Sequence, residues 1–279
     1  MSGKESKSQL NEWTQWFVWL LMESFKDYEG RIEFTTEYEL FSKPPRIDVV
    51  IVKLLEDFVI ENTVGKFFNR HNIIEFKSPK DTLNIESFKK VIGYSFFYMS
   101  QNNIEIEDTA ISFVSVRYPK KMIGYLEKRN FYEIIPSQDS GIYYINPKSN
   151  LSPLPKMQLV VSSQLSAEDV QWLELLRDNL TAKNLEKCFD LYEQTEKYRE
   201  QIEEVLRGLF TANSELLRTE EIMTVAQKRF NENFAYFAER TGMAKTWEQR
   251  GIQQGVQKLL DLLEKGVSLT EAKRMVLAR

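Results

Sequence analysis

All eight prolines of this 279-residue chain lie before residue 163, and the strand-like runs lie in the same part. Those runs are β-branched or aromatic and bounded by turn residues, and they cover 32–40, 47–52, 73–76, 110–116, 141–145 and 157–162. Helical spacing fills three intervening stretches, 13–27, 85–98 and 121–129. This alternation predicts an α/β domain over residues 1–163, with a mixed sheet core flanked by helices.

From residue 164 to the end, only helical spacing recurs, which predicts a C-terminal all-helical region over residues 164–279. Ser166, followed by two acidic residues, predicts the N-cap of its first helix. Near the end, Gly251 and Gly255 place small residues four apart on one helix face. Two interpretations of this Gly-repeat tail stay open: packing that builds a homo-oligomer through the C-terminal helices, or a frayed end.

Three charged residues stand out on the strand-like runs. Asp48 lies within the run at 47–52, while Glu75 and Lys77 flank Phe76 at the end of the run at 73–76. On a strand, residues two apart project from the same face, so Glu75 and Lys77 share a face, and Asp48 joins them if its strand is adjacent. Two carboxylates suit a hard divalent cation, and an ammonium group suits an attacking water or a charged phosphorane.

The residues around this set resemble a known nuclease group. The run His71-Asn72-Ile73-Ile74-Glu75-Phe76-Lys77-Ser78-Pro79, with Phe88-x-Lys90-Val91-Ile92-Gly93-Tyr94 after it, resembles the recombination-promoting nuclease and transposase-associated branch of the PD-(D/E)XK nuclease superfamily. The resemblance implies a restriction-endonuclease-like sheet core, Mg²⁺ or Mn²⁺ as cofactor and a DNA phosphodiester as substrate. One departure is that Ile47, and not proline, precedes Asp48.

The same resemblance implies roles for single residues. Asp48, Glu75 and the backbone carbonyl of Phe76 would bind the metal, and Lys77 would serve the water, either as a base or as an orienting group. A further glutamate is implied near the first helix. Glu23, in the helical stretch, and Glu37, in the strand-like run after it, are both candidates, and the sequence does not choose between them.

Composition argues against two other classes of protein, those that coat nucleic acid by charge and those that span a membrane. The net charge of −4 argues against coating nucleic acid by bulk electrostatics, so DNA binding would need a local basic patch. Such a patch is expected near the site, with Tyr118 as a stacking surface; its basic members are Lys66, Arg70, Lys80, Lys89, Lys90, Arg117, Lys120 and Lys121. No apolar run is long enough to span a membrane and the N-terminus lacks signal-peptide features, so we expect a cytoplasmic protein.

Single residues of reactive types receive structural interpretations. Cys188 is the only cysteine and is expected to be a small buried residue. His71 is the only histidine and is expected to make a structural hydrogen bond, so a His–Cys zinc cluster is excluded. Aromatic residues at helical spacing, such as Phe88, Phe96 and Phe97, are expected in the core.

The sequence therefore predicts a Mg²⁺-dependent DNA endonuclease, linked to recombination or mobile elements. The alternative is a catalytically inactive module of the same fold that binds nucleic acid or protein. Cleavage of RNA would use the same chemistry and stays open, as do sequence preference and cut geometry.

Overall fold

The computed structural model describes residues 3–39, 46–54, 58–148 and 154–217, and a discontinuous set of positions between 219 and 262. Its contacts divide the chain into two compact units. The first comprises Met1–Asp178 and Gln194–Ile202, and the second Asn179–Glu193 and Glu203–Arg279. The first unit extends beyond residue 163, where the sequence suggested an edge, because the segment after it packs against the first helix.

The first unit is built on one mixed sheet of seven strands in the order β1-β2-β3-β4-β7-β6-β5. The strands are β1 (Ile32–Glu39), β2 (Arg46–Lys53), β3 (His71–Lys77), β4 (Thr109–Ser115), β5 (Tyr132–Pro136), β6 (Ile142–Pro147) and β7 (Lys156–Val161). The three central strands β3, β4 and β7 are parallel, and the outer pairs on each side are antiparallel. The carboxyl ends of the parallel strands therefore meet at one edge of the sheet.

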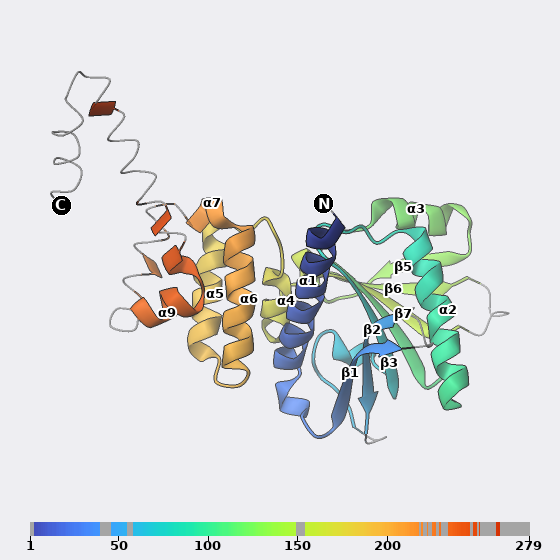
Figure 1. The fold of residues 1–279 in the computed structure, drawn as a ribbon. Coiled ribbons are helices and arrows are strands. Elements are labelled where there is room, and N and C mark those ends of the chain that lie inside the picture. Colours follow the sequence, from blue (N-terminus) through green and yellow to red (C-terminus); the bar gives the residue numbers. More distant parts are fainter. Residues whose placement is uncertain are drawn as a thin grey trace. The chain divides into compact units, whose positions relative to one another are not determined.

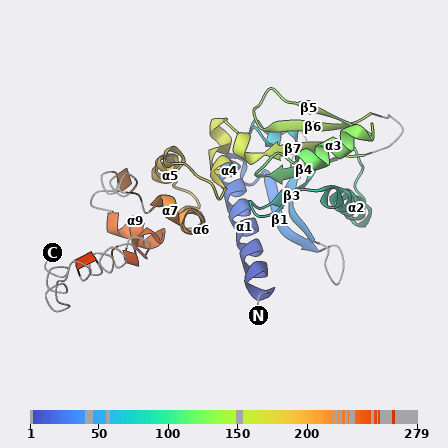
Figure 2. The same cartoon turned by 90° about the horizontal axis from the view of Figure 1, so that it is seen from above.

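Helices cover both faces of this sheet (Figures 1 and 2), which confirms the predicted α/β class. The first unit contains α1 (Gly3–Ser24), α2 (Ile85–Asn102), α3 (Lys120–Lys128) and α4 (Gln171–Leu175), with short 3₁₀ turns at Lys26–Tyr28, Gly65–Phe67, Ser162–Gln164 and Glu168–Val170. Figure 2 shows α2 and α3 on one side of the sheet and α1 and α4 on the other. The sheet is thus the middle layer of three.

Ring contacts identify which strand residues belong to which face. Phe88 of α2 stacks on Phe113 of β4 at 5.1 Å, and Phe17 of α1 stacks on Phe76 of β3 at 4.3 Å. Because Glu75 is paired with Phe113, Glu75 shares the α2 face, whereas Phe76 lies on the α1 face. The core on the α2 face also includes Ile73, which lies two residues before Glu75 on β3.

The second unit is helical in the part that the structure describes, which confirms the predicted C-terminal class. It contains α5 (Ala182–Gln194, except its last residue), most of α6 (Arg199–Ala212), α7 (Ser214–Leu217) and α9 (Phe234–Arg240). Glu203, only 1% exposed, accepts a hydrogen bond from the Tyr192 hydroxyl at 2.7 Å and pairs with Arg240. Most of the Gly-repeat tail, Gly255 included, lies outside the described residues.

Several local predictions are corrected by the structure. Residues 132–136 form the edge strand β5, which is absent from the strand-like runs identified in the sequence. Ser166 caps no helix, because a 3₁₀ turn at Glu168–Val170 comes first and α4 begins only at Gln171. Phe88 is buried as expected, but Phe96 and Phe97 are 38% and 49% exposed because they lie on the outer side of α2.

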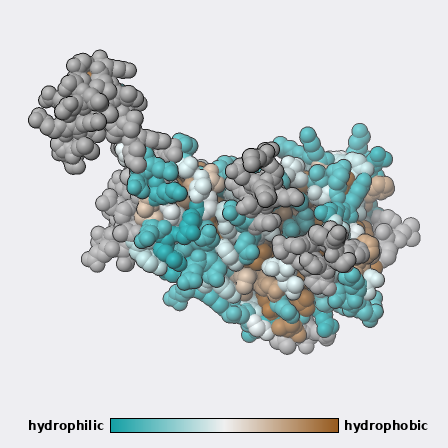
Figure 3. Space-filling model, viewed as in Figure 1, coloured by the Kyte–Doolittle hydropathy of each residue, from teal (hydrophilic) through white to brown (hydrophobic). Residues whose placement is uncertain are grey.

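The surface of the first unit is mixed. Figure 3 shows apolar residues gathered where Figure 1 labels β1 and β3, with hydrophilic residues around them. Among the described residues, no helix is long and apolar enough to cross a membrane.

Candidate functional site

The predicted acidic and basic side chains meet where β2 separates from β3. The β2–β3 pairing runs from Val52 opposite His71 to Val49 opposite Ile74 and then ends. One step further along the same register, Asp48 and Glu75 face each other across the fork between the two strands. The β1–β2 pairing continues past this point, so β2 leaves β3 while it stays bound to β1.

Asp48 replaces the missing backbone partner at the fork. Its Oδ2 accepts a hydrogen bond from the amide N–H of Phe76 at 2.9 Å. The pKa of the Asp48 carboxyl is raised from 3.8 to about 7, chiefly by burial and also by the negative charge of Glu75, although the Phe76 amide, Lys77 and Lys90 act to lower it. A nearby cation would favour the ionised form of this buried carboxyl.

Glu75 and Lys77 form the second half of the site. The Lys77 Nζ lies 2.6 Å from the Glu75 Oε1, and both side chains are largely buried. Burial alone would lower the pKa of Lys77, but the carboxylates of Glu75 and Asp48 outweigh it, and the pKa lies above its ordinary 10.5. Lys77 is therefore an ammonium group at neutral pH when no metal is bound, because the two carboxylates favour its charged form.

The backbone carbonyl of Phe76 points toward the same fork. On an extended strand, the N–H and C=O of one residue face the same neighbouring strand. The Phe76 N–H is bound to Asp48 of β2, so its C=O also faces the β2 side, beyond the last β2–β3 pair. The local sequence pattern does not predict the Asp48–Phe76 hydrogen bond, because that bond depends on β2 lying next to β3.

The two candidate glutamates have different positions. Glu23 lies in the last turn of α1, on the sheet face opposite Glu75, and its Oε1 pairs with Lys26 at 2.8 Å. Its other carboxylate oxygen is buried and has no hydrogen-bond partner among the residues that the structure describes. Since the next residue but one, Phe25, stacks on Phe68 before the start of β3, Glu23 lies near the end of β3 remote from Lys77. The structure does not bring Glu23 to the site.

Glu37 has a backbone position beside Asp48. Thr36 is paired with Val49 and Tyr38 with Ile47, so Glu37 on β1 is across from Asp48 on β2. Its side chain lies outside the described residues. Of the two glutamates, only Glu37 has a strand position next to the fork.

The expected basic patch is brought together only in part. Lys90 of α2 lies close enough to lower the pKa of Asp48 by its charge. Lys66 instead pairs with Asp139 at 2.6 Å on the α1 side of the sheet. Arg70 precedes β3, whose seven residues separate it from Lys77 by about 20 Å. Lys66 and Arg70 are therefore not neighbours of the site, because β3 carries them to its opposite end.

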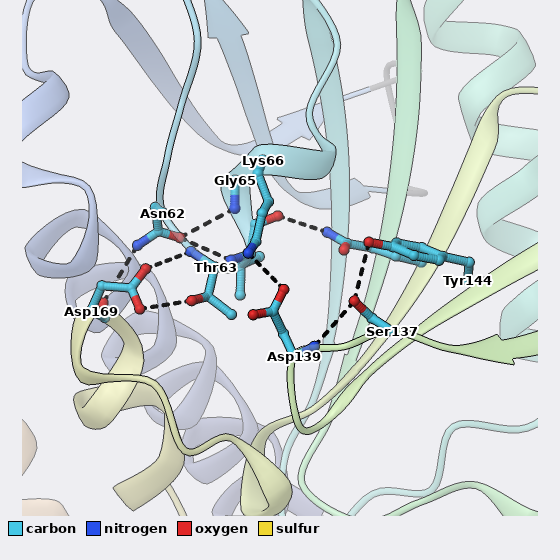
Figure 4. Close-up of polar contacts among 10 residues, drawn as sticks. Asn62, Thr63, Gly65, Lys66, Ser137, Asp139, Tyr144 and Asp169 are labelled. Atoms are coloured by element: carbon cyan, nitrogen blue, oxygen red, sulfur yellow. Dashed lines mark hydrogen bonds and ion pairs between the residues drawn. The ribbon is translucent and has the colours of Figure 1, made fainter.

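A second polar cluster lies on the α1 face, and Figure 4 shows it in detail. The Asp169 carboxylate accepts from both the amide and the hydroxyl of Thr63, and Asn62 accepts from two backbone amides through Oδ1. Lys66 and Asp139 complete it as an ion pair. These groups satisfy one another, so the cluster fixes the 62–66 loop over the sheet.

The remaining reactive residues have the structural roles expected of them. His71 Nδ1 lies 3.0 Å from the Tyr98 hydroxyl, which confirms a structural hydrogen bond. Cys188 is fully buried in the helical unit, which confirms its interpretation as a small core residue. Neither contributes a ligand to the fork.

The donor set at the fork fits a small divalent cation. Among the described residues, no cluster of three or more His, Cys, Asp and Glu side chains is arranged to hold a metal ion. The fork supplies two carboxylates, Asp48 and Glu75, and one inward carbonyl, that of Phe76. Mg²⁺ in proteins is commonly held by one or two carboxylates with water and substrate phosphate as its other ligands. The residues present match that pattern.

Comparison of the chain with protein-family models, curated proteins and solved structures gives no match.

Proposed function

We propose that the fork between β2 and β3 is the active site of a metal-dependent endonuclease that hydrolyses phosphodiester bonds in DNA. The observation that carries the proposal is the convergence of Asp48, Glu75 and Lys77 on one sheet face. The Lys77 ammonium lies 2.6 Å from Glu75, and Asp48 is held by the Phe76 amide. The site lies at the carboxyl end of β3, the region where open α/β sheets commonly bind ligands.

Each residue has a chemical role in this proposal. Asp48, Glu75 and the Phe76 carbonyl would hold Mg²⁺ or Mn²⁺, and the position of Glu37 makes it the candidate for an additional ligand. When bound, the cation supplies Lewis acidity toward the phosphoryl group. Lys77 would carry its proton in the metal-free site, because the two carboxylates raise its pKa, and it would serve the attacking water either as an orienting group or as a base.

The flanking charges support an anionic substrate. Lys90, on the helix that covers this face, lies close enough for its charge to act on Asp48, so it adds a second positive charge to that of Lys77. Since the net charge of the chain is −4, attraction of a polyanion would depend on these local cations. The resemblance of the segment around Lys77 to recombination-associated nucleases motivates DNA as the substrate and mobile-element processing as the setting.

The test is cleavage of supercoiled and linear DNA by the full chain with Mg²⁺, with Mn²⁺ and with EDTA. Lys77→Met keeps the length of the side chain and removes its charge, so we expect a loss of at least 100-fold in cleavage rate. Lys128→Ala, at an exposed lysine in the last turn of α3, is the matched control and should cleave like the wild type. Circular dichroism shows whether each variant is folded.

The outcomes separate the proposal from its alternatives. Cleavage that persists in EDTA or in Lys77→Met would refute it. A folded wild-type protein that binds DNA equally with and without metal, yet never cleaves it, would favour the inactive binding module. A matched RNA substrate in the same assay decides between the two nucleic acids.

A further inference from the structure

An aromatic pair lies on the same sheet face as the proposed active site. The rings of Tyr118 and Tyr143 meet edge to face, with centroids 5.1 Å apart and planes at 63°. Tyr118 follows β4, whose last residue, Ser115, is paired with Lys77. Tyr143 is reached from Glu75 by stepping across the sheet through Phe113 and Leu159. At ~4.8 Å for each of the three steps, Tyr143 lies about 14 Å from Glu75 along this row.

The Tyr118–Tyr143 pair is held in place by contacts within the first unit and is partly exposed to solvent. The Tyr143 hydroxyl donates to the Gln164 Oε1 at 2.7 Å, which fixes that ring. Both tyrosines pack against the core of the α2 face but are only partly buried. Burial raises the pKa of the Tyr118 phenol above its ordinary 10.0, so its ring is neutral at physiological pH.

Cations lie directly beside Tyr118 in the sequence. Lys120 and Lys121 begin α3, are exposed, and make no ion pair with any other described residue. Arg117 is oriented by the Pro79 carbonyl at 3.0 Å and by Asp178 at 3.1 Å, yet its side chain stays 64% exposed. The segment after β4 therefore combines the aromatic ring of Tyr118 with positive charge.

Such a combination is suited to unpaired bases. In a duplex, both faces of a base are covered by its neighbours, whereas an unpaired base can stack on a protein ring. Stacking tolerates any base because each has a π-face, and nearby lysines neutralise the phosphates that follow.

We infer that Tyr118, braced by Tyr143, stacks on an unpaired base a few nucleotides from the scissile phosphate. The preferred substrate then carries a single-stranded segment at the cut, as at a splayed junction, a flap or a free end. This inference rests on the proposed function, because it takes the fork at Asp48 and Glu75 as the cleavage point. It specifies the class of DNA substrate that the site accepts.

The test measures binding apart from cleavage. The full chain carrying Lys77→Met is titrated with a fluorescent single-stranded oligonucleotide, with the duplex of the same sequence and with a splayed junction. Two variants are made in this Lys77→Met chain. Tyr118→Leu keeps apolar bulk against the core, and Tyr118→Phe keeps the aromatic ring. Tyr125→Ala, at an exposed tyrosine of α3, is the control.

We expect Tyr118→Leu to weaken single-strand and junction binding by about 10-fold or more, in keeping with the contribution of one stacked base. Duplex binding should change less than about 2-fold, and Tyr118→Phe and Tyr125→Ala should bind like the parent. A 2-aminopurine base at the junction should lose its quenching in Tyr118→Leu only. Unchanged single-strand binding in Tyr118→Leu, or an equal loss for duplex and single strand, would overturn the inference.

The two proposals fail in different ways. If the wild type does not cleave but single-strand binding depends on Tyr118, the stacking site stands and the catalytic assignment falls. If metal-dependent cleavage depends on Lys77 while Tyr118→Leu leaves all binding unchanged, the catalytic assignment stands and the stacking site falls.

Discussion

Asp48→Asn should stabilise the metal-free protein while it abolishes cleavage. Asn keeps an oxygen that can accept from the Phe76 amide, but it removes a charge that is buried beside Glu75. A rise of the Asp48 pKa from 3.8 to about 7 means that the folded state holds this proton more tightly than the unfolded state does. The wild type is therefore penalised wherever pH exceeds the unfolded value.

The sign and size of the effect follow from this difference. Below about pH 4 the Asp48 carboxyl is largely neutral in both the folded and the unfolded state, so the wild type and Asp48→Asn should be equally stable. As pH rises toward 7 the wild type loses stability relative to Asp48→Asn, by about 2 kcal/mol at pH 5 and at most about 4 kcal/mol at pH 8. Above pH 7 the difference should level off.

Urea unfolding in EDTA at pH 5, 6, 7 and 8 measures the difference. Tryptophan fluorescence suits the purpose, because four of the five tryptophans lie in the first unit. Asp27→Asn, at an exposed aspartate, is the control and should show no such trend. Added Mg²⁺ should raise the stability of the wild type at pH 8 and leave Asp48→Asn unchanged, since only the native site binds it. A difference that does not grow between pH 5 and pH 7 would refute the reasoning.

Three further predictions follow from single sites. Glu37→Gln should raise the Mg²⁺ concentration needed for half-maximal cleavage by about 10-fold, whereas Glu23→Gln should not; a metal titration of cleavage rates decides, and the reverse ranking would remove Glu37 from the site. Tyr192→Phe should lower the free energy of unfolding of the helical unit by about 1 kcal/mol, because Glu203 loses a buried hydrogen-bond donor; urea unfolding followed by circular dichroism measures it, and an unchanged midpoint would contradict it. The imidazole of His71 should titrate below its ordinary 6.5, because burial and a neighbouring arginine lower its pKa; NMR shows this without ambiguity for a single histidine, and a value above 6.5 would be inconsistent with the structure.

Local pattern was sufficient for the strand that carries the site. Alternation placed Glu75 and Lys77 on one face, and the pairing of Glu75 with Phe113 and of Lys77 with Ser115 confirms it. Alternation also gave Asp48 a place beside them once β2 and β3 were neighbours. What it could not give was the end of the β2–β3 ladder at Val49, because the length of a pairing depends on both strands together.

The position of Glu23 and the existence of β5 depend on long-range packing, which the local sequence pattern does not contain. Glu23 was correctly expected on a helix, but the stacking of Phe17 on Phe76 puts that helix on the face away from the site. The strand β5 was missed because it ends at Pro136, which reads as a turn residue in isolation. Proline is acceptable there because β5 is an edge strand, whose outer amides need no partner.

The bond between Thr63 and Asp169 also constrains how the chain can be made and cut. It joins residues 106 positions apart, and Asp169 lies beyond residue 163, where the sequence alone would end the domain. A truncated chain that stopped at 163 would leave the Thr63 amide and hydroxyl unpaired, at about 1–3 kcal/mol for each buried group. During synthesis, the 62–66 loop cannot lock until Asp169 has left the ribosome, so the nascent sheet stays incompletely covered until then.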